Sequence, residues 1–543
     1  MKKNDLLILS FLFSKNMFWA RPADMLHRYS QTREYSPLFP LRPGTMMIVL
    51  VVGIILLFPG SVSASVALIE MVRTALEHSP GLLLEKQNLR TSESAMLSAR
   101  SAFDPQISLS SLYSRTESTP LIPELKTVSS TVSSSTLLPI GVTVAPNVSV
   151  KGNTTPPAPA VNIAAAGVTF TVPLLQGLGN NTRRMLMSST LKSYRAEGCT
   201  LQHTAATTIN SAAAAYWNYV FAYQTLKVDQ QLTHNAEDAL RATKALAIAG
   251  DQPLIKASQA EAYLQQKKAV EITDAQALRQ AWSDLFLAIG CSIKGREIPE
   301  PPVDSFPRPD QDLSLLADIS KLKAKALASR ADLQSLRLLI EAANDNLAGS
   351  RNNIKPKIDL ALYAGYSGQY SGSTVPDYFA ALTSQVQGAN VSATLTYTFA
   401  TANNSKESTF ISNSAIFETA VINRDVLERT IGDGVGIAAE SVKNCAATLR
   451  LVMKSAETYR FLNTTELKKF RSGISDLYKV QQVSTDMASA EQQLLAAEKA
   501  YAFSILNFRY QIAALMHERD GIYNVDERDL VTIPALDNTG STL

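Results

Sequence analysis

The feature that most constrains this chain is an internal duplication. Residues 65–290 and residues 316–515 carry apolar residues, prolines and glycines in the same order. The aligned pairs include Arg100 with Arg351, Pro105 with Pro356, and Gly250 with Gly473. The duplication predicts a fold that builds the same elements twice, each half being helix, strand, loop, strand, long helix and helix.

Four other segments lie within and around the two halves. The alignment shifts by 28 residues at an insertion in the first half, at about residues 114–165. Because this insertion is rich in Ser, Thr and Pro, we expect an external loop there, in which Val142–Val150 can form a small hairpin. A proline-rich linker, residues 291–315, joins the halves, and residues 516–543 form a C-terminal tail.

Alternation of apolar and polar residues predicts strands in both halves. Val391–Phe399 alternates for nine residues, and Val168–Val172 is its counterpart. Shorter alternations follow Pro105 and Pro356. Strands of about nine to eleven residues fit the apolar band of an outer-membrane β-barrel, roughly 25 Å tall. A half-buried sheet of a soluble protein gives the same pattern, because Ser and Thr suit a solvent-exposed face as well as a barrel lumen.

Long proline-free segments predict helices of unusual length. Residues 178–249 contain no proline, and at 1.5 Å per residue such a helix spans about 105 Å. The helices expected at 66–101 and 254–289 are together as long as this one. The second half repeats the relation with the segments 317–353, 404–472 and 477–514. Two shorter helices stacked end to end beside one long helix form a rod too long for a globular core.

Residues 1–64 have the pattern of a leader followed by a signal peptide. Met46–Phe58 is an apolar run of thirteen residues, too short for a transmembrane helix of about 20 residues but typical of a signal-peptide core. The small-residue site Val62–Ala64 follows, and we expect cleavage between Ala64 and Ser65. The mature chain is therefore expected to leave the cytoplasm.

Composition argues against several classes of protein. A net charge of +3 is too small to indicate nucleic-acid binding. Three cysteines form no C-x-x-C pair, and the five histidines are scattered. Cys199 and His203 lie on one face of a predicted helix, but two ligands make a poor metal site. Because no nucleophile, base or carboxylate pair has a catalytic context, we expect no enzyme, cofactor or metal.

Taken together, these marks resemble the TolC-type outer-membrane efflux protein family over residues 66–515. They occur in order and in duplicate: the Ala-Leu openings at Ala75 and Ala326, the Arg100…Pro105 and Arg351…Pro356 entries to the first strands, Val172–Gly177 after the second strand, and the turns Gly250…Gln259 and Gly473…Gln482. Each mark is weak alone, and their repeated order makes the match specific.

The resemblance implies a mixed, mostly α-helical fold in the outer membrane with a long periplasmic extension. A homotrimer with four strands per protomer would close a twelve-stranded transmembrane β-barrel above a coiled-coil α-helical tunnel. Closure by oligomerisation agrees with the physics, because open sheet edges are not tolerated in lipid. The implied partners are outer-membrane lipid, a periplasmic adaptor (membrane fusion) protein and an inner-membrane transporter. The implied function is a passive exit duct of a tripartite efflux pump or a type I secretion system.

The resemblance also places the periplasmic aperture of the tunnel at the turns after the two long helices. The residues expected there are Gly250, Ile255, Lys256, Phe470, Gly473, Ser475, Lys479 and Gln482. Many family members carry Asp six residues after each glycine, where this chain has Lys256 and Lys479, and Gln482 occupies a further position where Asp can occur. Phe470 lacks the hydroxyl of an aromatic often found there, and Ser475 replaces a basic residue. A ring of lysines would weaken cation selectivity, whereas two solvated lysines near a turn would have no such role.

Two functions therefore remain open from the sequence. One is the export channel, and the alternative is a structural or adhesive trimeric coiled-coil protein of the cell surface without transport activity. The duplicated alternating strands favour the channel, because a coiled-coil stalk has no use for them.

Overall fold

The computed structural model describes most of the chain after the expected signal peptide. The described residues are 66–116, 125–154, 159–249, 253–294, 299–310, 313, 316, 318–384, 390–472, 474–519 and 522–534. The expected cleavage residues Ala64 and Ser65 and the turn glycines Gly250 and Gly473 lie outside them.

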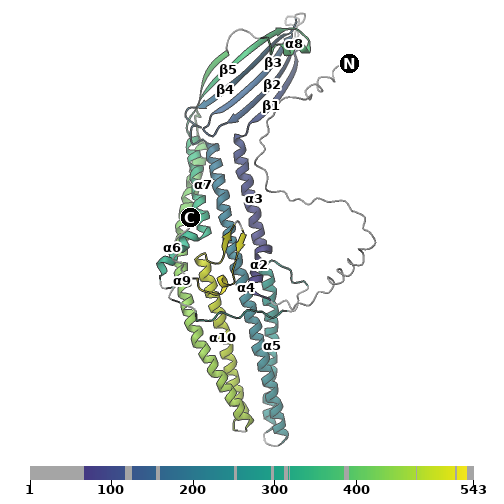
Figure 1. Cartoon of the computed structure of the whole chain (residues 1–543), viewed down its shortest axis with the longest axis vertical. Coiled ribbons are helices and arrows are strands. Elements are labelled where there is room, and N and C mark those ends of the chain that lie inside the picture. Colours follow the sequence, from purple (N-terminus) through teal and green to yellow (C-terminus); the bar gives the residue numbers. More distant parts are fainter. Residues whose placement is uncertain are drawn as a thin grey trace, which may run out of the picture. The chain divides into compact units, whose positions relative to one another are not determined.

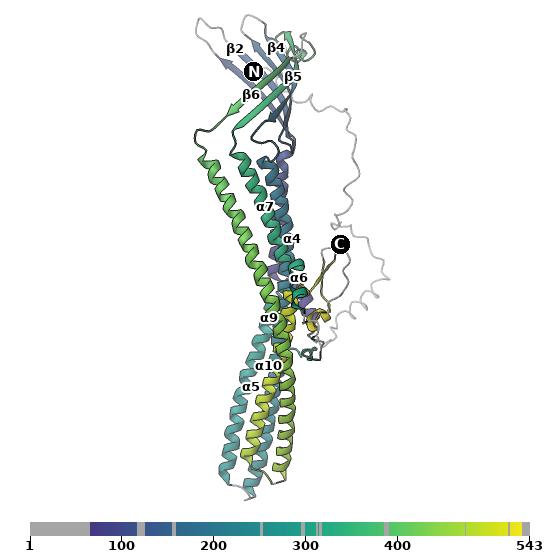
Figure 2. The same ribbon diagram turned by 90° about the vertical axis from the view of Figure 1, so that its left-hand side faces the viewer.

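Eight helices form most of the described structure. They are α2 (Leu68–His78), α3 (Pro80–Arg100), α4 (Thr182–Ile248), α5 (Leu254–Ala288), α6 (Ile319–Ser329), α7 (Ala331–Asn353), α9 (Asn404–Arg471) and α10 (Leu477–Gln511). Helix α4 has 67 residues and α9 has 68. Helix α4 packs along α5, α7 and α3, and α9 packs along α10 and α7 (Figures 1 and 2). The expectation of long helices paired with shorter ones is confirmed.

Two of the expected helices are each broken once. The segment expected at 66–101 is interrupted at Ser79, because Pro80 has no N–H and starts a new helix from an extended residue. The segment expected at 317–353 is interrupted at Arg330, which has the extended backbone angles φ −70° and ψ 120°. In both halves the break separates a short helix of 11 residues from the helix that leads to the sheet.

All six long strands of the described residues form one antiparallel sheet at the end of helices α3, α4, α7 and α9. The strands are β1 (Gln106–Thr116), β2 (Leu125–Leu137), β3 (Thr143–Thr154), β4 (Val161–Pro173), β5 (Lys357–Ser371) and β6 (Asn390–Thr398). Their order in the sheet is their order in the chain (Figures 1 and 2). Helix α8 (Val375–Ala380) lies at the far end of the sheet, and a small hairpin, β7 (His517–Arg519) with β8 (Ile522–Asn524), precedes α11 (Arg528–Val531).

The expectation of four strands per chain is wrong. The insertion at residues 114–165, expected to be an external loop with at most a small hairpin, contains the whole of β2 and β3. These strands have 13 and 12 residues and pair with β1 and β4. The alternation in β2 escapes detection because Ser and Thr fill both faces of Leu125–Leu137, and inside the strand only Val128 and Val132 mark the apolar one.

An aromatic core fixes the start of the described chain against the middle of the helices. Trp217 on α4 and Trp282 on α5 are fully buried within it. The hydroxyl oxygen of Tyr216 lies 3.0 Å from the carbonyl oxygen of Val66 and 2.7 Å from Oδ2 of Asp304 in the linker. Asp304 also accepts a hydrogen bond of 2.6 Å from the backbone N–H of Leu68. The linker therefore ties the first described residues to α4.

Candidate channel wall and helical turns

The sheet has one apolar face, defined by its register. Paired residues of antiparallel strands point to the same side, so the pairs Leu109–Val132, Val132–Val148 and Val148–Ala166 form one row across four strands. Most large side chains of this face are exposed in the single chain, and Val150 is buried beneath the segment after α8. The exposed ones include Ile107, Leu109, Tyr113, Val128, Val132, Val148, Phe170, Leu362, Val391, Leu395 and Tyr397. A continuous exposed apolar face of this kind requires a partner that is not water.

The opposite face of the same sheet is rich in Ser, Thr and Asn, with Leu112 and Ile163 among them. Its members include Ser108, Ser110, Thr127, Ser129, Thr131, Ser133, Asn147, Ser149, Thr169, Thr171, Ser392, Thr394 and Thr396. The hydroxyls of Ser108 and Ser133 lie 2.8 Å apart across β1 and β2, and Asn390 donates a 3.0 Å hydrogen bond to the Ser367 hydroxyl. An apolar face behind a polar one is the arrangement that separates lipid from an aqueous lumen in outer-membrane barrels.

Strands β1 and β6 are the two edges of the sheet in this chain. Each has a neighbour on one side only. Every residue of β6 and all but one of β1 are exposed. A bilayer leaves no backbone hydrogen bond for such an edge, so the sheet is complete in lipid only when further strands pair with it.

The ends of the two helical hairpins pack on each other within one chain. Leu240 of α4, Leu264 of α5 and Leu477 of α10 are buried in one cluster, against which Phe470 of α9 is packed. Phe470 also lines a cleft of about 420 Å³ between α4 and the α9–α10 end, together with Val480. The structure thus gives Phe470 a packing role that its chain position alone did not indicate.

The other expected aperture residues sit on the first turns of α5 and α10 and the chain before α10. Ile255 is 64% exposed, Lys256 is half-buried, and Lys479 is exposed. The backbone N–H of Lys479 donates to the Asp476 side chain at 2.9 Å, which caps α10. Within the described part of the chain, no carboxylate forms an ion pair with either lysine ammonium, whereas Lys244 of the same region pairs with Glu261 at 2.8 Å.

Polar residues near the second turn bond to neighbours within their own hairpin. The Ser475 hydroxyl donates to Glu466 of α9. The Gln482 amide donates to Asp486, one turn further along α10, at 3.0 Å. These contacts fix the Ser475 and Gln482 side chains locally. That the two residues line the aperture stays a prediction.

Two acidic residues of the helical region, buried Asp229 and half-buried Asp274, form a pair that the sequence pattern does not indicate. Asp229 of α4 is 2% exposed, and its Oδ2 has no hydrogen-bond partner within the described structure. Burial, reinforced by the Asp274 carboxyl of α5, raises the pKa of Asp229 to about 6, while Gln492 of α10 and Lys267 act in the opposite direction. The two residues are far apart in sequence and on different helices, so no spacing rule would have paired them.

The substitution Asp229→Asn is expected to stabilise the protein at neutral pH. A folded pKa of about 6, above the unfolded value of ~3.9, means that stability rises as pH falls from 7.5 toward 4 and that the charged form costs on the order of 2–3 kcal/mol above pH 6. Asn removes that cost, so the midpoint of thermal unfolding should rise at pH 7.5 and depend less on pH between 5 and 7.5. Asp284→Asn on the exposed side of α5 is the matched control. A midpoint that falls at pH 7.5 would contradict the burial argument.

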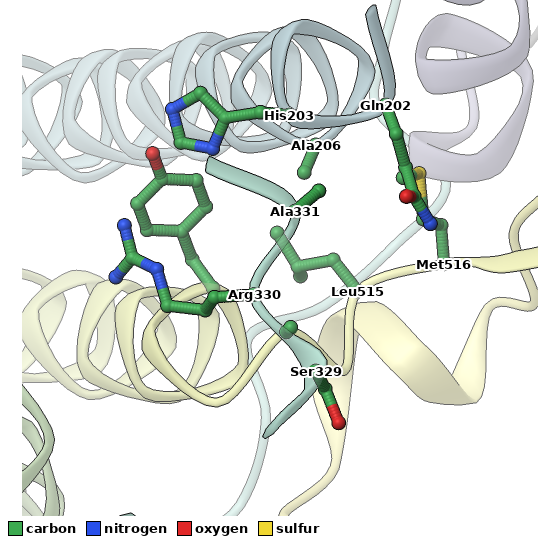
Figure 3. Close-up of a pocket in the computed structure, with 10 residues that line it drawn as sticks. Gln202, His203, Ala206, Ser329, Arg330, Ala331, Leu515 and Met516 are labelled. Atoms are coloured by element: carbon green, nitrogen blue, oxygen red, sulfur yellow. The ribbon is translucent and has the colours of Figure 1, made fainter. Parts of the chain in front are cut away.

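A second polar cluster joins α4, the start of α7 and the end of α10 (Figure 3). Arg330 binds Asp332 through two hydrogen bonds of 2.7 and 3.0 Å and donates to Gln511 at 2.8 Å. Its guanidinium lies 5.6 Å from the ring of Tyr510, and burial lowers the pKa of the neighbouring His203. The enclosed volume is about 50 Å³, and the groups bond to each other. The cluster therefore braces helices and offers no room for a substrate.

Two further observations concern metal sites and membrane-spanning helices. Cys199 and His203 share α4 as expected, but the described residues contain no group of three or more candidate metal ligands. None of the described helices combines the length and hydropathy needed to cross a membrane.

Comparison with known proteins yields a family match and a set of similar folds. The model of the family described as outer membrane efflux protein matches residues 71–291. No curated protein sequence matches the chain.

The similar solved structures cover 82% of this chain at low identity. The CmeC outer membrane channel of Campylobacter jejuni has 14% identity, a TM-score of 0.59 and 85% of its own length covered. The outer membrane protein VceC of Vibrio cholerae has 13% identity, a TM-score of 0.60 and 95% covered. The MtrE outer membrane channel of Neisseria gonorrhoeae has 15% identity, a TM-score of 0.58 and 88% covered. At these identities the likeness concerns the fold.

Proposed function

We propose that this chain is an outer-membrane efflux channel of the outer membrane efflux protein family, whose model matches residues 71–291, and that it serves as the passive exit duct of a tripartite efflux pump or type I secretion system. The observation that carries this proposal is the two-faced sheet, apolar on one side and Ser/Thr-rich on the other, at the end of helices α3, α4, α7 and α9. Such a wall lets polar cargo pass through a bilayer without contact with lipid. No energy-coupling site is needed in a passive conduit.

The working unit in this proposal is a homotrimer. The unpaired edges β1 and β6 of each copy are completed by the neighbouring copies. A row of exposed apolar side chains on α9 is available to pack against the helices of a neighbour, as in a coiled coil: Ile411, Ile416, Ile422, Val426, Ile437 and Leu451. Sheet edges and helix faces would thus be satisfied by the same assembly.

The partners in this proposal are a periplasmic adaptor and an inner-membrane transporter. The resemblance to the family supports both, with the helical turns near Lys256 and Lys479 as the meeting place. The adhesive coiled-coil alternative is less well supported, because it leaves the exposed apolar face of the sheet unexplained.

The mass of the purified protein in mild detergent tests the assembly. We expect a detergent-stable trimer, measured by light scattering with detergent correction. A protein that is only monomeric under several mild detergents would contradict the proposal, because edges β1 and β6 would then have no partners.

A further inference from the structure

We infer that residues 125–154 form two membrane-spanning strands of the channel wall, so that each chain contributes six strands and the assembled barrel has eighteen. The count of eighteen rests on the trimer of the proposed function; the assignment of β2 and β3 to the wall does not. The inference departs from the four strands per chain expected from the sequence, and it concerns the width of the conduit.

The length and register of β2 and β3 are those of wall strands. They have 13 and 12 residues, against about 9–11 needed to cross a bilayer. Strand β2 pairs with β1 over all eleven residues of β1, and β3 pairs with β4 from Thr143–Thr171 to Asn153–Val161. If these residues formed an external loop, their hydrogen-bonded pairing with β1 and β4 would not extend over the full height of the sheet.

The valines of the inserted hairpin also continue the apolar face of the sheet. Val128, Val132 and Val148 fall on the apolar face, and their neighbours Thr131 and Ser149 fall on the polar face. A hairpin surrounded by water gains nothing from this sorting, whereas a wall between lipid and water requires it.

The hairpin is fixed at its helical end by a tight turn. The Leu138 N–H donates to the Val142 carbonyl at 2.8 Å, and Gly141 has a φ of +98°. A Cβ on Gly141 would lie 2.2 Å from the carbonyl oxygen of Gly177, and the Asn181 amide donates to the Pro139 carbonyl at 3.1 Å. The turn is therefore built into the junction between β4 and α4, and short turns on this side are typical of outer-membrane barrels.

The far end of the hairpin is fixed as well. The Tyr378 hydroxyl of α8 donates a 2.6 Å hydrogen bond to the Val150 carbonyl. Val150 and Ala164 are buried beneath Ala381, which follows α8. The segment between β5 and β6 thus packs across β3 and β4, and the hairpin is held at both ends by parts of the chain distant in sequence.

Three six-stranded sheets can also close into one barrel in which all neighbouring strands are antiparallel. Strand β1 starts at the helical end of the sheet, and β6 returns to it (Figures 1 and 2). In a trimer β6 of one copy would therefore run antiparallel to β1 of the next, and the total of eighteen strands is even. With a strand spacing of ~4.8 Å and a tilt of about 40°, the backbone radius grows from about 12 Å for twelve strands to about 18 Å for eighteen. The membrane section would have roughly twice the cross-section, which suits bulkier hydrated cargo.

Cysteine labelling tests the hairpin. In a background with Cys199, Cys291 and Cys445 replaced by Ser, single cysteines are introduced as Thr131→Cys and Ser149→Cys on the polar face and as Val132→Cys and Val148→Cys on the apolar face. In proteoliposomes, a membrane-impermeant maleimide should label the polar-face positions about tenfold faster or more, because the reaction needs a thiolate in water. Fast labelling of all four positions in an intact trimer would overturn the inference and leave the proposed function standing. Absence of a trimer in the unsubstituted protein would count against the proposed function.

Disulfide formation gives a second readout. Ser110→Cys with Thr131→Cys joins paired positions of β1 and β2 and should form a disulfide, detected by mass spectrometry of the digested protein. Ser110→Cys with Thr169→Cys should not, because two intervening strands separate β1 from β4 by about 14 Å. If the second pair cross-links and the first does not, β1 lies directly beside β4 and the wall has four strands per chain.

Discussion

Replacing Leu240 with proline is expected to abolish the detergent-stable trimer. Leu240 is 8% exposed and lies in the last third of α4, where it packs against α5 and α10. An interior proline costs ~3 kcal/mol or more, and loss of the buried side chain adds about 2–5 kcal/mol. Leu494→Pro in α10, 7% exposed, should have the same effect. Size-exclusion chromatography with light scattering measures the trimer yield.

Two controls separate a broken helix from lost packing. Leu240→Ala keeps the helix and should reduce the trimer yield less than Leu240→Pro does. Ile319→Pro places proline at the first position of α6, where the missing N–H has no intrahelical partner, and should assemble normally. Normal trimer yield from both Leu240→Pro and Leu494→Pro would show that assembly does not require α4 and α10 to be continuous helices.

The double substitution Lys256→Asp and Lys479→Asp is expected to move the channel toward cation preference. If both lysines face the lumen, each trimer exchanges six positive charges for six negative ones, and charges that line a pore decide which ions it favours. The reversal potential in planar bilayers under a salt gradient should therefore shift in the cation-selective direction. The shift should be smaller at high salt, where the charges are screened over about 3 Å at 1 M.

The neutral pair Lys256→Gln and Lys479→Gln is the matched control at the same positions. It should give an intermediate reversal potential, as expected when charge and not side-chain volume is responsible. An unchanged potential in the Asp variant would mean that the lysines point away from the lumen and are solvated residues of a turn.

The bounds of helices α5 and α9 could be predicted from the sequence to within one residue. The expected segment 254–289 is α5 at Leu254–Ala288, and 404–472 is α9 at Asn404–Arg471. Prolines and turn residues bound these segments, and periodic apolar positions run along them, so local rules suffice. The same rules missed the extended residue Arg330, whose pairing with Asp332 and Gln511 depends on the end of α10.

The strands were harder to predict than the helices, because Ser and Thr are frequent in the sheet and weaken the alternation of apolar and polar residues. Strand β6 was found because Val391, Leu395 and Tyr397 alternate with Thr and Ser. In β2, Ser and Thr occupy both faces, so composition indicated a loop where the structure has a strand paired on both sides. The acidic pair Asp229 and Asp274 could not be predicted either, because only the packing of α4 on α5 brings the two carboxyls together.

The location of the expressed protein in a membrane density gradient tests the central claim most directly. A channel wall with an apolar face must reside in the outer membrane, so the protein should sediment with the dense outer-membrane fraction and resist extraction by urea or carbonate. Recovery in the soluble periplasmic fraction, or release by urea, would contradict the account, because the apolar face that carries it would then be exposed to water.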